Sequence, residues 1–214
     1  MPRPTTITLA YATGDPNGIC ASQTATSTGG SNLTIAGALA TGGVATLDAA
    51  RHVSITSTGN NSTKTFTITG TDRYSNAITE SLSGPTGGAV YTTKNFATVT
   101  NVAIDAASAG AVIVGSGDQG ESQWIPLDRY STQRSVSVDL STGANFTFDI
   151  QHTNDNVQAE GFQETSATAY ADPTIASKSA DQFLGNMVLS RAIRLKVTSH
   201  VAGSATLTLV QGGE

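Results

Sequence analysis

Histidine is the residue of this 214-residue chain best suited to acid–base catalysis or metal binding, and it occurs three times. His52 and His152 are predicted at the ends of strands and His200 in a turn, and none has a partner at the spacing of a metal site. The sequence also lacks the G-x-S-x-G nucleophile motif, a phosphate-binding loop and the dinucleotide-binding glycine pattern. We therefore expect a protein that is not an enzyme, with no catalytic, metal-binding or cofactor-binding residues.

Acidic residues gather in the second half of the chain, but their spacing is poor for a hard cation. Calcium loops place carboxylates at alternate positions around an obligatory Gly, whereas Asp155, Glu160 and Glu164 do neither well. We interpret this run as a solvated acidic loop. A second polar pair, Asp72 and Asn76, is typical of turn chemistry rather than of a binding site.

Short β-type runs dominate the elements that would position these side chains, most clearly in residues 51–83. Apolar residues recur there at every second position, which is the period of a half-buried strand. Turn clusters rich in Gly, Asn, Asp and Ser at 58–62 and 72–76 divide three such runs, so we predict an antiparallel meander. In residues 89–105 the alternation changes parity, which indicates a β-bulge or a bend near Thr98.

The same alternation returns near the C-terminus. Apolar residues alternate in 136–140 and 146–150, on either side of a turn at 141–145, and again in 193–197 and 207–209. Because each pair of runs is joined by a short Gly-containing turn, we predict two β-hairpins.

These strands predict an all-β fold of two small antiparallel β-sandwich or jelly-roll-like domains with an extended N-terminal segment. We place the first domain at residues 1–117, beginning with an arm at 1–31 that offers few apolar groups to bury. The Gly-rich run 115–120 is the predicted linker. The second domain spans 121–214 and contains a long loop at 152–190, which we expect to dock on its own domain or on another subunit. Periodicity does not distinguish a jelly-roll from an immunoglobulin-like strand order.

Composition argues against several classes of partner. Charged residues make up 13% of the chain, about half of the typical share, and the net charge is −5. The 11 Lys and Arg residues form no basic stripe, so we expect no nucleic-acid partner. No apolar run approaches the roughly 20 residues that span a bilayer, and the N-terminus lacks the apolar core of a signal sequence. With one cysteine, Cys20, the sequence predicts synthesis in a reducing cytoplasm, no membrane partner and no disulfide framework.

Six turn and strand segments, which together cover about half of the chain, have a familiar pattern. They are VSITSTGNN at 53–61, FTITGTD at 66–72, NAITESLSGP at 76–85, KNFATV at 94–99, AIRLKVTS at 192–199 and LTLVQGG at 207–213. These segments resemble parts of the structural proteins of tailed bacteriophages. The resemblance implies a virion component, made in the host cytoplasm and assembled in many copies, whose partners are other copies of itself and the major capsid protein or other virion proteins.

Within that class we predict a head decoration, or cement, protein that binds and stabilises the capsid lattice, and a trimer would match the threefold sites of such a lattice. A neck or tail connector, or a fibre-base subunit, is the alternative. A carbohydrate-binding adhesive module is the third hypothesis, and it would require aromatic residues clustered with the only tryptophan, Trp124. Aromatic and apolar side chains of the arm and of the second domain are the predicted contact residues: Ile7, Leu9, Tyr11, Trp124, Phe162, Tyr170 and Phe183.

Overall fold

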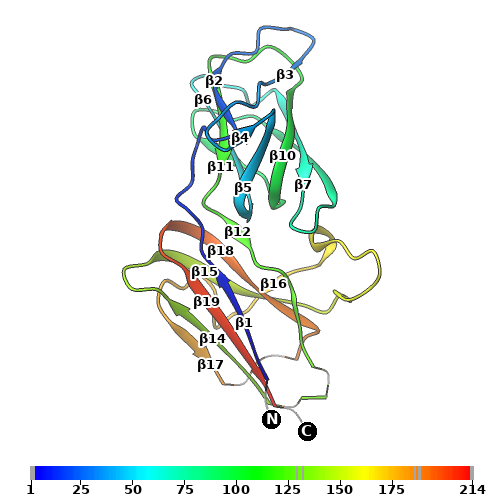
Figure 1. The fold of residues 1–214 in the computed structure, drawn as a ribbon, viewed down its shortest axis with the longest axis vertical. Coiled ribbons are helices and arrows are strands. Elements are labelled where there is room, and N and C mark those ends of the chain that lie inside the picture. The colour runs from blue at the N-terminus through cyan, green and yellow to red at the C-terminus, as the bar shows by residue number, and fades with distance from the viewer. Residues whose placement is uncertain (1–2, 129, 132, 186, 188, 213–214) are drawn as a thin grey trace. The chain divides into compact units, whose positions relative to one another are not determined.

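The computed structural model describes residues 3–212 except 129, 132, 186 and 188. Their regular structure is β-strand apart from one 3-10 turn, η1 (Glu164–Ser166), so the predicted all-β class is confirmed (Figure 1). No helix in this part of the chain is long and apolar enough to cross a membrane. The chain folds as two compact units, one formed by Gly14–Gly120 and the other by the residues up to Thr13 together with those from Glu121 onward.

The N-terminal unit, residues 14–120, contains two antiparallel sheets. The larger has the strand order β4-β5-β10-β7-β8, with β3 also paired to β10, and the smaller has the order β2-β11-β6-β9. The strands are β2 (Cys20–Gln23), β3 (Ser31–Asn32), β4 (Ala40–Thr41), β5 (Val44–Arg51), β6 (Val53–Ser57), β7 (Thr65–Thr71), β8 (Ala77–Ser83), β9 (Ala89–Tyr91), β10 (Phe96–Ile104) and β11 (Val112–Ser116). One cluster of fully buried apolar side chains, including Phe66 and Phe96, forms its core.

The predicted meander is only partly correct. β7 and β8 form the expected hairpin, paired from Thr65↔Ser83 to Thr71↔Ala77. β6, however, pairs with β11 and β9 in the other sheet. The turn at 58–62 therefore leads from one sheet to the other, and burial of four of the five residues of β6 fits a strand that is covered on both faces.

Two local predictions for this unit are confirmed. The register of β10 shifts between Phe96 and Thr98 against β5, which is the bulge predicted near Thr98. Asp72 does act as a turn residue: its Oδ1 accepts hydrogen bonds from the backbone N–H groups of Tyr74 (2.8 Å) and Asn76 (2.9 Å). These bonds hold Ser75 at a φ of 65°, in the left-handed region.

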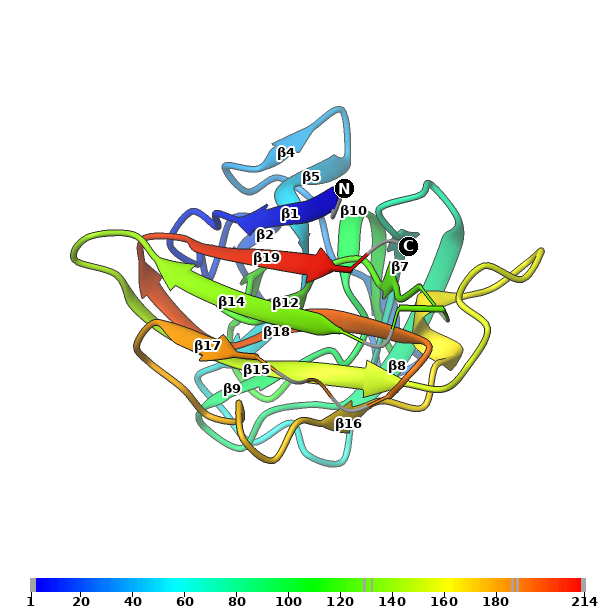
Figure 2. The same cartoon turned by 90° about the horizontal axis from the view of Figure 1, so that it is seen from below.

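The C-terminal unit also has two antiparallel sheets, with orders β1-β19-β14-β17 and β12-β18-β15-β16, and β13 pairs with β18. Alternate residues of β14, β15, β18 and β19 are buried, which is the pattern of two sheets packed face to face. The strands are β1 (Arg3–Leu9), β12 (Gly120–Glu121), β13 (Ile125–Pro126), β14 (Arg134–Leu140), β15 (Asn145–Thr153), β16 (Tyr170–Ala171), β17 (Gln182–Leu184), β18 (Ala192–Ala202) and β19 (Ala205–Gln211). Figure 2 shows β17 and β1 at the two edges of one sheet.

The two hairpins predicted for this unit are wrong. β14 pairs with β19 over Arg134–Leu140, and β15 pairs with β18, so each short turn connects strands of different sheets. The two turns hold each other, because Ser141 N–H donates to Ser204 O and Ser204 N–H donates to Ser141 Oγ, both at 3.0 Å. A short Gly-containing turn thus serves equally well as an arch between two sheets.

The predicted N-terminal arm is also corrected. Residues 3–13 belong to the C-terminal unit rather than to a domain at 1–117, because β1 pairs with β19 along its whole length. The rest of the predicted arm is folded into the N-terminal unit, where β2 pairs with β11. The strand partner of β1 thus lies at the opposite end of the sequence.

The long loop at 152–190 docks on its own unit, which is one of the two predicted outcomes. β16 pairs with the end of β15, and β17 pairs with the middle of β14. Ile175 is almost completely buried, and its carbonyl oxygen accepts a hydrogen bond from Ile150 N–H of β15 (2.9 Å). Asp172 N–H donates in turn to Ile150 O (2.8 Å). The loop therefore supplies short edge strands to both sheets of the C-terminal unit.

Candidate functional site

A polar pocket of about 710 Å³ lies where β15 and β19 end and β18 begins. We call it the polar pocket. Backbone hydrogen bonds hold its walls: Leu127 N–H donates to Arg191 O (2.8 Å), and Arg191 N–H donates to Thr153 O (2.9 Å). Leu127 is buried, whereas most of the polar lining residues are exposed. The lining residues are Pro126, Leu127, Asp128, Tyr130, Asp155, Asn156, Val157, Gln158, Arg191 and Gln211.

Both carboxylates of the polar pocket are fixed by backbone donors. Asp128 Oδ1 accepts from Tyr130 N–H at 2.9 Å, and Asp128 N–H donates to the amide oxygen of Gln211 at 2.5 Å. Asp155 Oδ2 accepts from Thr168 N–H at 2.6 Å. Because each carboxylate uses one oxygen in this way, its side chain is oriented while the second oxygen remains able to accept a bond from a ligand.

A hydrogen-bonded chain of Ser190, His152 and Asp172 lies in the same unit. His152 Nε2 is 2.8 Å from Asp172 Oδ2, and His152 Nδ1 is 3.1 Å from Ser190 Oγ. A neutral imidazole that donates Nε2–H to Asp172 has its lone pair on Nδ1, so it accepts the Ser190 O–H. The same order of side chains, Ser–His–Asp, occurs in a serine protease catalytic triad. In the triad, however, Nε2 faces the serine and Nδ1 faces the aspartate.

The surroundings of Ser190 favour a structural role for this chain. Acyl transfer requires N–H donors for the developing oxyanion, but the N–H that follows Ser190, that of Arg191, already donates to Thr153 O. Asp172 also accepts bonds at Oδ1 from the N–H groups of Thr174 (2.8 Å) and Ile175 (3.2 Å). We therefore interpret the chain as a clamp that holds the long loop on β15.

The charge of Asp172 makes this clamp dependent on pH. Burial alone would raise the pKa of Asp172, but the hydrogen bonds from His152, Thr174 and Ile175 outweigh burial and hold the pKa below its ordinary value of 3.8. A carboxylate with a lowered folded-state pKa adds stability that is fully present above that ordinary value. The contribution is lost as the pH falls through the lower folded-state value.

We accordingly expect Asp172→Asn to destabilise the C-terminal unit by about 2 kcal/mol at about pH 5, where the wild-type carboxylate is ionised. The difference should shrink as the pH falls through the lowered folded-state pKa of Asp172, because the wild-type group then becomes protonated. Denaturation followed by the fluorescence of Trp124, the only tryptophan, measures this. The exposed Asp181 offers a matched control as Asp181→Asn. A stability difference for Asp172→Asn that does not change with pH would contradict the clamp.

The structure places the predicted contact residues in three groups. Leu9, Tyr11 and Trp124 are buried in the C-terminal unit, and Arg194 stacks on the Trp124 ring with its guanidinium carbon 4.5 Å from the ring centroid. Ile7 and Phe162 are half-buried. Among the predicted contact residues, only the two aromatic residues of the edge strands are strongly exposed, Tyr170 by 61% and Phe183 by 73%. Side chains of the first group already serve the core, so Trp124 does not offer an aromatic binding surface.

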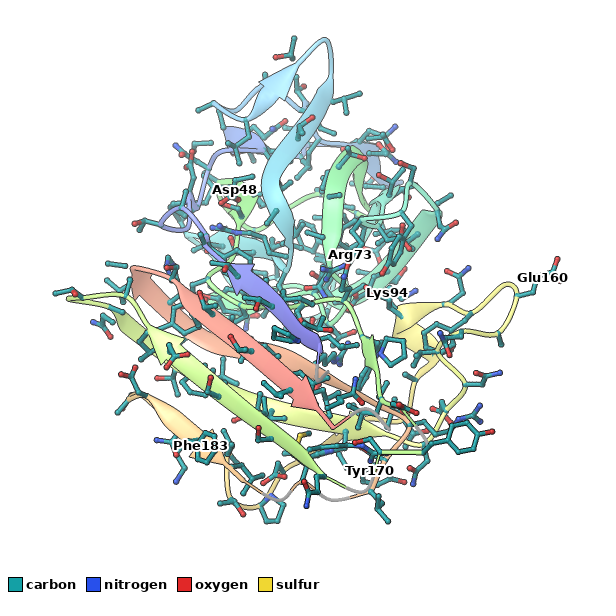
Figure 3. The ribbon with its side chains drawn as sticks, turned by 60° about the horizontal axis from the view of Figure 1, so that its bottom comes forward. Asp48, Arg73, Lys94, Glu160, Tyr170 and Phe183 are labelled. Carbon is teal, nitrogen blue, oxygen red and sulfur yellow. The ribbon has the colours of Figure 1, made fainter. Side chains whose placement is uncertain are left out.

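Sequence reasoning missed both the polar pocket and the histidine clamp. Asp172 and Ser190 lie 20 and 38 residues from His152, so spacing along the chain does not associate them. Asp155 belongs to the run interpreted as a solvated loop, yet it lines the pocket, whereas Glu160 does lie exposed at the tip of that loop (Figure 3). Among the described residues, no group of three or more His, Cys, Asp or Glu side chains is placed to hold a metal ion.

Comparison with protein-family models and with curated proteins finds no match to this chain.

Proposed function

We propose that this protein is a non-enzymatic structural component of a tailed-bacteriophage virion, and that it is a head decoration protein that binds and stabilises the capsid lattice. The observation that carries the proposal is the pair of exposed aromatic side chains, Tyr170 and Phe183, on the short edge strands β16 and β17 (Figure 3). Exposed aromatic residues supply much of the binding energy at protein interfaces.

The edge position adds a second means of attachment. A strand at the edge of a sheet has backbone N–H and C=O groups that are not paired within the sheet, and another chain can pair with them. β17 lies at one end of the order β1-β19-β14-β17, and its central residue is Phe183. Low charge also supports the proposal, since charged residues form only 13% of the sequence and the core of an interface is depleted of them.

Copy number and position in purified particles test the proposed location. A decoration protein should be distributed over the whole shell, in stoichiometric proportion to the major capsid protein, in an image reconstruction and by gel densitometry. A ring of copies confined to one vertex would overturn decoration and establish the alternative, a neck or tail connector. Absence from purified particles would overturn both.

The predicted contact is tested by Phe183→Ser. We expect this change to weaken binding to particles that lack the protein by about tenfold or more, because an exposed aromatic anchor would be lost. Co-sedimentation with such particles gives the affinity. Val201→Ser is the matched control, since Val201 is an apolar residue of the same unit that is 51% exposed and lies on β18 rather than on β17. Equal affinities of the two variants would show that β17 is not the contact.

A further inference from the structure

Several exposed hydrogen-bonding groups line the polar pocket. They include the side chains of Asn156, Gln158 and Arg191, all of which are exposed. Asp128 and Asp155 each keep one carboxylate oxygen beyond the bond that orients them. The pocket therefore presents amide donors and acceptors, guanidinium donors and carboxylate acceptors in one concave surface.

The balance of these groups indicates the class of ligand. Two carboxylates and one guanidinium give the lining a net charge of about −1 at neutral pH, which disfavours phosphates and other anions. A hydroxyl group both donates and accepts hydrogen bonds, so a molecule with several hydroxyl groups can pair with amides, carboxylates and guanidinium alike. The volume of about 710 Å³ lies within the range of about 300–1,000 Å³ that is typical of ligand pockets.

Tyr130 adds an exposed aromatic surface to the lining of the polar pocket. Its side chain is 78% exposed, while its backbone N–H is held by Asp128 Oδ1. The face of an aromatic ring is apolar and electron-rich, and it attracts the C–H groups that cover one face of a pyranose ring. Leu127 and Val157 provide further apolar lining. A neutral sugar combines hydroxyl groups at its edge with C–H groups on its face, which is the combination that this lining matches.

We propose that the polar pocket binds a neutral saccharide, with Tyr130 stacking on the sugar ring and with Asn156, Gln158 and Asp155 binding its hydroxyl groups. This site is distinct from the aromatic platform around Trp124 that an adhesive module would require, because Trp124 is buried beneath Arg194. The inference does not depend on the virion assignment, since the pocket is formed entirely by the C-terminal unit.

A glycan array that presents neutral and anionic oligosaccharides is the first experiment, carried out with the purified 214-residue protein. We expect binding to a subset of the neutral oligosaccharides. Titration calorimetry with one of the oligosaccharides that bind should then show the effect of two variants. We expect the affinity to fall by at least about tenfold for Tyr130→Ala and for the double variant Asn156→Ala/Gln158→Ala. Comparison of that free oligosaccharide with a purified cell-surface polysaccharide containing the same unit distinguishes a small-molecule site from a polymer site.

Tyr170→Ala is the matched control, because Tyr170 is an exposed tyrosine of the same unit that lies outside the polar pocket. It should bind with the wild-type affinity, and unchanged Trp124 fluorescence will show that each variant is folded. Binding to anionic glycans alone, binding to no glycan, or undiminished binding by folded Tyr130→Ala would each overturn the proposal. These measurements use no virus particles, so their failure leaves the proposed virion role to its own tests.

Discussion

Deletion of residues 1–13 is expected to unfold the C-terminal unit while leaving the sequence of that unit from Glu121 onward intact. β1 pairs with β19 from Arg3↔Gln211 to Leu9↔Ala205, and the deletion would remove that pairing. It would also remove the buried side chains of Leu9 and Tyr11. We estimate a loss of about 5 kcal/mol or more, which approaches the whole stability of a small domain. Loss of the native Trp124 emission, and a denaturation midpoint shifted to zero or near zero denaturant, would measure it.

Single substitutions in the same segment provide the control. Tyr11 is buried, and its ring lies edge-on to His200 with 6.0 Å between the centroids, so Tyr11→Ala should cost about 3 kcal/mol. Thr6→Ala, at an exposed position of β1, should change stability by less than about 0.5 kcal/mol. If the truncated protein keeps the wild-type midpoint, β1 is not part of the sheet and residues 1–13 form the free arm that the sequence suggested.

Local features of this fold could be predicted from the sequence because each depends on neighbouring residues. Alternation of apolar residues identified most of the longer strands, since side chains of a strand point to opposite faces in turn. The turn at Asp72 and the bulge near Thr98 were predicted for the same reason. In each case the deciding interaction lies within a few residues of the signal.

Strand pairing could not be predicted in this way. A period of two tells which face of a strand is buried, but it does not tell which strand lies beside it. The turn at 141–145 illustrates this, because its residues suit a hairpin and yet join β14 in one sheet to β15 in the other. β1 and β19 pair although they lie at opposite ends of the chain.

The candidate site was missed for the same physical reason. The polar pocket is built from four separate parts of the sequence, namely 126–128 with Tyr130, 155–158, Arg191 and Gln211. None of them contains a recognisable motif, and only pairing of β13 and β15 with β18 brings the first three together. Composition and residue spacing do not reveal a binding site that forms only where segments distant in the sequence come together in the fold.

The glycines at 115–120 illustrate a different limit of the sequence. The run was predicted to be a linker, and the boundary between the two units does fall at its end, between Gly120 and Glu121. Gly115, however, lies within β11, where it pairs with Ser54 of β6. Further along, Gly117 N–H donates to His52 O at 2.7 Å, and His52 N–H donates to Gln119 O at 2.9 Å. The lack of a side chain at Gly115 is needed for close backbone approach rather than for flexibility.

Gly115→Ala should therefore destabilise the N-terminal unit by about 3 kcal/mol or more, although the change adds a single methyl group. A Cβ at this position would lie 1.8 Å from Asp15 O and 2.4 Å from the carbonyl carbon of Pro16, both of them backbone atoms. The crossing segment cannot move aside easily, because Ser116 N–H donates to Asp15 O (2.9 Å) and Ile19 N–H donates to Val114 O (3.0 Å).

Urea denaturation followed by far-ultraviolet circular dichroism tests this expectation against Gly88→Ala. No heavy atom lies within 4 Å of the Cβ that Gly88 would gain, so this control should stay within about 0.5 kcal/mol of the wild type. The two substitutions add the same methyl group and remove the same backbone freedom from the unfolded chain, so their difference isolates the clash in the folded state. Equal stabilities would mean that residues 15–16 do not cross β11 at Gly115, and the run 115–120 would again be interpreted as a linker.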